Sequence, residues 1–121
     1  MICTLGDLLV DVIVRGPAQL AAGADTPVET RLASGGQAAN VAAWAVELGE
    51  EARFVGKVGD DATAELARSL LERRGVEVLG PAVEGRNGVV VALVGPDGER
   101  TMATDRGVAP DLRPDEAADQ K

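Results

Sequence analysis

The sequence predicts an α/β fold in which a doubly wound, Rossmann-like parallel sheet carries a small β lid. Over about the first 80 residues, strand-like apolar runs alternate with helix-like segments. This alternation is typical of parallel βαβ units with right-handed crossovers. A loop-rich stretch after the first apolar run and a hairpin signature after Pro81 interrupt it. We expect these two excursions to form the lid.

The first strand is expected to be buried and to continue past Gly6, because residues 2–5 and 8–14 are both apolar. Asp11 interrupts the second of these runs, and a buried carboxylate there requires a partner or a ligand. After a loop, residues 28–32 alternate as a short strand does.

A first helix is expected over residues 38–48, with Val41, Ala45 and Leu48 on its buried face. Trp44 is assigned to the core. Gly49 follows the last helical residue, where a glycine in the left-handed region commonly ends a helix.

A second core strand is expected over residues 52–58, followed by a second helix over residues 62–74 that ends at Gly75. Asp60 and Asp61 precede this helix. They could be paired carboxylates for metal or acid-base chemistry, but capping of the helix N-terminus explains them better. A short third strand is expected over residues 76–79.

The segment 89–104 has the signature of a β-hairpin, because two strand-like runs flank the turn Gly95-Pro96-Asp97-Gly98. Pro114 and the acidic residues after it predict the start of another helix that would run toward Lys121. A helix that begins so near the last residue indicates a chain that stops in mid-fold.

Composition and charge exclude several functional classes. Only 2% of the 121 residues are aromatic, and 12 basic against 20 acidic residues give a formal charge of −8. Nucleic acid and anionic membranes are therefore not expected as partners. The absence of histidine excludes Ser-His-Asp triads, and no metal site is expected.

Cellular location is inferred from the same composition. Cys3, the only cysteine, is expected to be a small buried hydrophobe. Neither a transmembrane segment nor a basic signal-peptide start is evident. We expect a cytoplasmic protein.

The strongest candidate site is the run Gly35-Gly36-Gln37-Ala38-Ala39-Asn40. Two glycines let a ligand approach the backbone closely, and a helix N-terminus has N–H groups without intrahelical partners. The amide of Asn40 can both donate to and accept from hydroxyl groups. On this motif alone, a tight turn that caps a buried helix is an equally good interpretation.

Together with Gly49 and the segment Phe54-Val55-Gly56-Lys57-Val58-Gly59-Asp60-Asp61, this motif resembles the ribokinase-like carbohydrate kinases of the phosphofructokinase-B (PfkB) type. The resemblance extends over nearly the whole chain. Residues 6–11 resemble the family's first strand, residues 98–101 its lid hairpin, and residues 105–107 the return from lid to core.

The resemblance implies a core of about residues 1–11, 33–86 and 106–121, with lid excursions at about 12–32 and 87–105. It implies that Asp11 accepts hydrogen bonds from sugar hydroxyls. Gly35 and Gly36 would present backbone N–H groups to the substrate, and Asn40 would hold a further hydroxyl. Gln37 and Ala38 depart from the lysine and glycine of some members, so no ribose specificity is assigned.

The family's second signature, a glycine-rich run that supplies an anion hole and the catalytic base, is absent from these 121 residues. We therefore expect an N-terminal portion of an ATP-dependent sugar or nucleoside kinase, with no catalytic residue of its own and inactive alone. ATP and Mg²⁺ would serve the complete protein and would not bind this chain tightly.

Two alternative functions fit parts of the sequence. A dinucleotide-binding domain has its glycine turn directly after the first strand, whereas Gly35 follows that strand by about two dozen residues, and no Gly-x-Gly-x-x-Gly is present. A non-catalytic module that binds sugar, or that forms a homodimer through the lid, remains open. Asp7 is expected to be structural, and Lys57 and Arg106 to be solvated or ion-paired.

Overall fold

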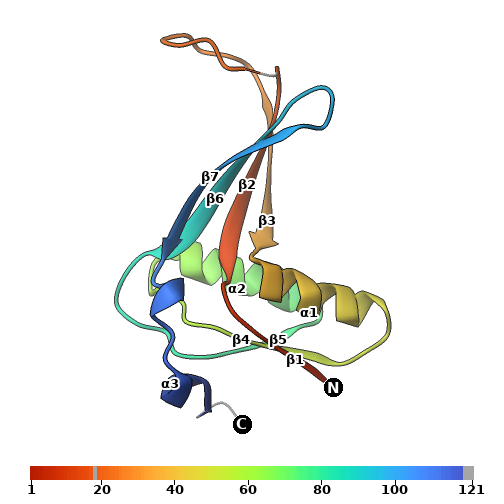
Figure 1. Cartoon of the computed structure of the whole chain (residues 1–121), viewed down its shortest axis with the longest axis vertical. Helices are drawn as coiled ribbons and strands as arrows, with labels where there is room; N and C mark the ends of the chain where they lie inside the picture. The colour runs from red at the N-terminus through yellow and green to blue at the C-terminus, as the bar shows by residue number, and fades with distance from the viewer. Residues whose placement is uncertain (18, 119–121) are drawn as a thin grey trace.

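The computed structural model describes residues 1–17 and 19–118, which form two sheets with a layer of helices between them (Figure 1). The core sheet is parallel, with strand order β1-β4-β5. Its strands are β1 (Ile2–Leu5), β4 (Ala52–Val55) and β5 (Glu77–Leu79). The crossovers are α1 (Gln37–Glu47) and α2 (Ala62–Arg73), and both lie on the same side of this sheet (Figure 1).

The lid sheet rises from the helix layer and has the strand order β3-β2-β6-β7 (Figure 1). Its strands are β2 (Leu9–Arg15), β3 (Glu29–Gly35), β6 (Asn87–Val94) and β7 (Arg100–Gly107). The β2–β3 and β6–β7 pairs are antiparallel, and β2 pairs with β6 in parallel. The predicted α/β class, with a parallel sheet and a β lid, is confirmed.

The expected single first strand is two strands in different sheets. The Gly6 N–H donates to the Val55 carbonyl at 3.1 Å, which ends β1 beside β4. A β-carbon on Gly6 would lie 2.9 Å from the Ala38 β-carbon, so the start of α1 packs closely against this turn. The chain then enters the lid sheet at Leu9. The prediction was wrong because both halves are apolar and nothing local marks the change of sheet.

The predicted limits of α1 are confirmed to within one residue, but of its predicted buried face only Ala45 packs against the core, whereas Val41 and Leu48 are exposed. The buried residues are Ala39, Ala42 and Ala43. Trp44 and Leu48 are 58% and 85% exposed, respectively. Alanines pack the helix closely against the core, whereas the prediction placed the bulkiest side chains inward.

Cys3 is exposed, contrary to the expectation of a buried hydrophobe. It lies on β1, which is an edge strand of the core sheet. The apolar residues next to Cys3 in the sequence therefore do not indicate a buried side chain in the described part of the chain.

Interactions of neighbouring residues determine the two ends of the second crossover helix, α2, as predicted. Asp61 is the N-cap of α2 and accepts a hydrogen bond from the Ala64 N–H at 3.0 Å. Gly75 has a φ of +90° just after the helix. The preceding strand is shorter than expected, since β4 ends at Val55 and Val58 forms only an isolated bridge with Ala82.

The predicted hairpin is confirmed in β6 and β7, and a 3-10 helix, η1 (Ala109–Asp111), leads to α3 (Pro114–Ala118). The predicted start of the last helix at Pro114 is confirmed, whereas its expected end at residues 119–121 lies outside the described residues. Lys57 holds this region by an ion pair to Glu116 at 3.0 Å and a hydrogen bond to the Asp111 carbonyl at 3.2 Å.

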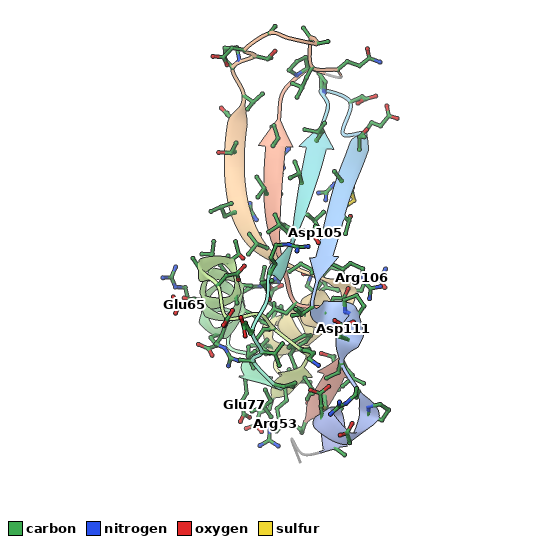
Figure 2. The ribbon with its side chains drawn as sticks, turned by 90° about the vertical axis from the view of Figure 1, so that its left-hand side faces the viewer. Arg53, Glu65, Glu77, Asp105, Arg106 and Asp111 are labelled. Carbon is green, nitrogen blue, oxygen red and sulfur yellow. The ribbon has the colours of Figure 1, made fainter. Side chains whose placement is uncertain are left out.

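The main core lies between the helices and the two sheets, with Phe54, Leu8, Leu71 and Val10 as its largest fully buried side chains. This core fixes the start of α1 against the base of the lid sheet. At the opposite end of the molecule from the lid tip, Arg53 and Glu77 form an exposed ion pair at 2.6 Å between β4 and β5 (Figure 2). None of the described helices is long and apolar enough to cross a membrane.

Candidate functional site

A pocket of about 600 Å³ lies where the lid sheet meets the N-terminus of α1. Its walls come from the turn after β1, from the first residues of α1 and from one face of the lid sheet. These three elements are brought together by the turn at Gly6 and by the buried core under α1. The pocket therefore lies at the junction of the two sheets.

The wall formed by α1 presents a bare helix N-terminus. The N-cap is Gly36, which makes no side-chain capping bond, and the first turn carries no acidic residue. Gly36 has a φ of +98°, and a β-carbon there would overlap the Asp7 carbonyl oxygen. Only glycine fits this position without strain. The first N–H groups of a helix have no intrahelical partners, so this wall can donate hydrogen bonds to a ligand.

Asp11 projects from β2 into the same pocket. A β-carbon on Gly35 would overlap the Asp11 carboxylate, so the glycine makes the space that the carboxylate occupies. Burial raises the pKa of Asp11 above its usual value, and the positive charge of Arg100 lowers it in part. The carboxylate is thus a partly desolvated hydrogen-bond acceptor.

The structure brings the residues predicted from sequence together. Asp11, Gly36 and Asn40 line the pocket, and Gly35 lies directly under Asp11. The Asn40 N–H donates to the Gly36 carbonyl at 3.0 Å, which places its side chain one turn into α1. Their roles in binding remain predictions, but their arrangement in one pocket is a property of the fold.

One wall was missed by the sequence analysis. Arg100, Met102, Thr104 and Arg106 alternate along β7 and line the pocket. Alternate residues of a strand share one face, and Val90 of β6, paired with Thr104, lines the pocket too. The period of two in residues 100–106 was the available signal. The same alternation is also typical of a hairpin strand with no ligand on it.

Arg106 lies at the base of the lid sheet (Figure 2). It donates to both carboxylate oxygens of Asp7, with Nε–Oδ2 at 2.7 Å and Nη2–Oδ1 at 3.0 Å. The expectation of an ion-paired Arg106 and a structural Asp7 agrees with this contact. The pair ties the end of β7 to the turn after β1.

No group of three potential ligands among His, Cys, Asp and Glu gathers as a metal site in the described part of the chain. Asp60 and Asp61 both accept backbone hydrogen bonds. Asp60 accepts from Gly85 at 3.2 Å, while Asp61 caps α2 and also accepts from Asn87. Their geometry is that of turn and cap residues.

The comparisons with known proteins agree with this geometry. The family model described as pfkB family carbohydrate kinase matches residues 1–121. Over 93 residues the chain is 38% identical to a protein of Halopiger xanaduensis named ATP-dependent ribose-1-phosphate kinase, covering 75% of this chain and 31% of that protein. It is 34% identical over 122 residues to the Arabidopsis thaliana protein named probable fructokinase-4, covering 96% of this chain and 36% of that protein.

Among solved structures, the fold is similar to that of ribokinase from Giardia lamblia, with a TM-score of 0.83 at 21% identity. This match covers 98% of the present chain and 39% of the ribokinase chain. The chain thus spans about a third of the length of the curated relatives it matches.

Proposed function

The chain belongs to the pfkB family of carbohydrate kinases, and from this membership we propose that it is the acceptor-binding, N-terminal portion of an ATP-dependent kinase. The complete protein would transfer the γ-phosphate of ATP to a hydroxyl group of a sugar or nucleoside. The proposal includes the cytoplasmic location expected from the sequence.

The observation that carries this proposal is the convergence of Asp11, Gly36 and Asn40 in one pocket beneath the lid sheet. A carboxylate and an amide are well suited to bind hydroxyl groups, because together they supply hydrogen-bond acceptors and donors at fixed positions. The bare N-terminus of α1 adds backbone donors. Asp11 and Asn40 are both partly buried, so the loss of a ligand hydroxyl would leave a partly desolvated polar group unpaired, which favours a ligand rich in hydroxyls.

We propose that this chain alone does not bind ATP or Mg²⁺ tightly. Within the described residues no cluster of metal ligands exists, and the pocket's Arg106 is already bound to Asp7. We therefore propose that the nucleotide, the metal and the catalytic base belong to the remainder of the complete protein. The role of this chain in the proposal is to hold the acceptor.

The names of two relatives provide candidate acceptors. One relative is named a ribose-1-phosphate kinase and another a fructokinase. Pentoses, hexoses and their phosphates are accordingly the first compounds to test, with nucleosides included.

The second candidate is a module that binds sugar or forms a homodimer through the lid without catalysis. It is favoured by one observation: β3 is an open edge of the lid sheet, and its Leu32 is 49% exposed. Open edges are able to pair with another chain. Sedimentation of wild type and Leu32→Lys protein would show whether such a dimer exists.

The test of the kinase proposal is ADP formation by the full-length protein with a panel of pentoses, hexoses, their phosphates and nucleosides. Isothermal titration of the same compounds against wild type, Asp11→Ala and Asn40→Ala measures acceptor binding. The exposed loop residue Asp25 provides a matched control as Asp25→Ala. Equal heats for wild type and both pocket variants would contradict the assigned roles, and absence of binding by every compound would refute the proposal.

A further inference from the structure

We propose that the chain carries a second binding site, separate from the acceptor pocket, for a small oxyanion, either a phosphate or a carboxylate. The site is a cavity of about 420 Å³ at the outer edge of β3, next to the C-terminal ends of α1 and α2, and is called the edge cavity below. Its charged lining residues are Arg31, Glu47, Arg73 and Arg74. None of them lines the acceptor pocket, so the site does not depend on the proposed function.

The edge cavity wraps around the edge strand of the lid sheet (Figure 1). Ser34 lies on the face toward the helices, because it is paired with Val10 of the main core. Leu32 shares this face, whereas Arg31 and Ala33 lie on the other, since alternate residues of a strand point to opposite sides. All four β3 residues line the cavity, and the last turn of α2 forms its opposite wall. Groups from both faces of the sheet can therefore reach one ligand.

The charge of the edge cavity is opposite in sign to that of the whole chain. The chain has a formal charge of −8, whereas the described lining of the cavity has three arginines and one glutamate. That glutamate, Glu47, is paired with Arg74 at 3.2 Å. Arg31 and Arg73 have no hydrogen bond or ion pair to any residue among 1–17 and 19–118. Two guanidinium groups from different elements thus remain available to a ligand.

The end of α2 does not account for these arginines. Basic side chains in a last helical turn often interact with carbonyl groups that lack partners. Here the backbone supplies partners, since the Arg74 N–H donates to the Leu71 carbonyl at 3.0 Å and the Gly75 N–H to the Glu72 carbonyl at 2.9 Å. Arg73 donates to none of these carbonyls, and the arginine of β3 belongs to no helix.

Ser34 gives an independent indication of a ligand. This residue is only 4% exposed, and its hydroxyl group has no hydrogen-bond partner in the described part of the chain. Buried polar groups without a partner are rare in native proteins, because their desolvation is not compensated. Ser34 lines the edge cavity, and rotation about one bond gives its hydroxyl three staggered positions. An oxygen of a ligand at this point would supply the missing partner.

The chemistry of these groups favours an oxyanion over a cation or a neutral sugar. Arg31 and Arg73 can only donate hydrogen bonds, and the planar fork of a guanidinium matches the oxygens of a phosphate or carboxylate. The hydroxyl of Ser34 can donate to the same oxygens. Leu32 and Leu70 line the cavity as well and would contact the carbon atoms of an organic anion. Negative charge on the ligand would also balance the two unpaired arginines.

The experiment is isothermal titration of the full-length protein with inorganic phosphate, 3-phosphoglycerate and citrate, at an ionic strength held constant with sodium chloride. The variants of the edge cavity are Arg31→Gln, Arg73→Gln and Ser34→Ala. The matched control is Arg15→Gln, because Arg15 is an exposed arginine at the end of β2 that lines neither cavity. Arg100→Gln tests the acceptor pocket in the same way. Thermal unfolding verifies that each variant is folded.

We expect at least one of the three anions to bind, and Arg31→Gln and Arg73→Gln each to weaken this binding by about 10- to 100-fold. Ser34→Ala should weaken it by about two- to tenfold, since a hydrogen bond from a neutral group is lost. Arg15→Gln and Arg100→Gln should leave it unchanged. Binding of the two phosphates without citrate would assign a phosphate site, and binding of citrate alone a carboxylate site.

Three results would overturn the inference. The site does not exist if none of the anions binds the folded wild-type protein at millimolar concentration. The anion binds elsewhere if Arg31→Gln and Arg73→Gln have the same affinity as wild type. It belongs to the acceptor pocket if Arg100→Gln alone weakens its binding. The kinase proposal would stand in each case, because its test is the binding and phosphorylation of an acceptor.

Discussion

The carboxylate of Asp11 lies over the α-carbon of Gly35, in the space that any side chain at position 35 would fill. Gly35 is buried and belongs to β3, whereas Asp11 belongs to the neighbouring β2. The first glycine of the motif thus leaves room for the carboxylate beside it. It does not line the pocket itself, although its successor Gly36 does.

Gly35→Ala is expected to displace the Asp11 carboxylate and to weaken acceptor binding about tenfold or more, because a hydrogen bond to a charged group would be lost. Titration with the best acceptor measures the effect. The matched control is Ser34→Ala, since Ser34 is paired with Val10 on the opposite face and its buried hydroxyl has no hydrogen-bond partner in the described part of the chain. Equal affinity of wild type and Gly35→Ala would show that the carboxylate can move without consequence.

The pH dependence of binding should report on Asp11. Burial raises the pKa of this carboxyl above 3.8, and Arg100 lowers it in part. The ionised form is the better acceptor of hydroxyl hydrogen bonds, so affinity for a neutral sugar should fall as the pH decreases through this raised pKa. Arg100→Gln removes the lowering influence and should move the midpoint to higher pH. A midpoint at or below 3.8, or one that Arg100→Gln moves downward, would contradict this electrostatic account.

The same shift predicts opposite effects of one substitution on stability and binding. Because the folded-state pKa is raised, ionisation of Asp11 near neutral pH destabilises the folded chain relative to the unfolded chain. Asp11→Asn should therefore raise the melting temperature at pH 7, and the difference should vanish at a pH below 3.8. Acceptor binding should weaken at the same time. A lower melting temperature at pH 7 would indicate that the carboxylate has a structural role.

The parts of the fold that sequence reasoning predicted are those with local causes. Asp61 caps α2, and Gly49 and Gly75 end the helices with positive φ, because a helix end is determined by a few adjacent residues. The hairpin of β6 and β7 was predictable for the same reason, because the residues of its turn determine the local backbone angles.

The parts that were missed depend on contacts between distant residues. The change of sheet between Leu5 and Leu9 requires α1 to pack against Gly6. Trp44 is exposed because the face of α1 that packs closely against the core consists of alanines. In the candidate site, Asp11 and the motif at Gly36 were predictable because polar residues and glycines stand out within apolar sequence. Arg100 resembles an ordinary surface residue in the sequence, and only the pairing of the lid strands shows that it lines the pocket.

The capping of α2 leads to a prediction for low pH. Burial raises the pKa of Asp61, but hydrogen bonds from Thr63 and from the Ala64 and Asn87 backbone lower it to a net value below 3.8. A depressed folded-state pKa contributes stability above the unfolded value, and that stability is lost as the pH falls through the folded-state pKa. Denaturant unfolding should show Asp61→Asn less stable than wild type at pH 7, with the two converging well below pH 3.8. If the difference in unfolding free energy between wild type and Asp61→Asn stayed constant across this pH range, the charge of Asp61 would not contribute to stability.

Asn87 links the lid sheet to the core, and its removal should lower the free energy of unfolding. Its side chain, in a residue only 3% exposed, accepts from the Gly59 N–H and donates to the Leu8 carbonyl, each at 3.2 Å. Asn87→Ala leaves both groups unpaired in the interior and should destabilise the protein by about 2–3 kcal/mol. Glu84→Ala, at an exposed position nearby, should stay within about 0.5 kcal/mol of wild type. Urea unfolding measures both, and a loss for Asn87→Ala no larger than that of the control would show that the lid sheet is held without this residue.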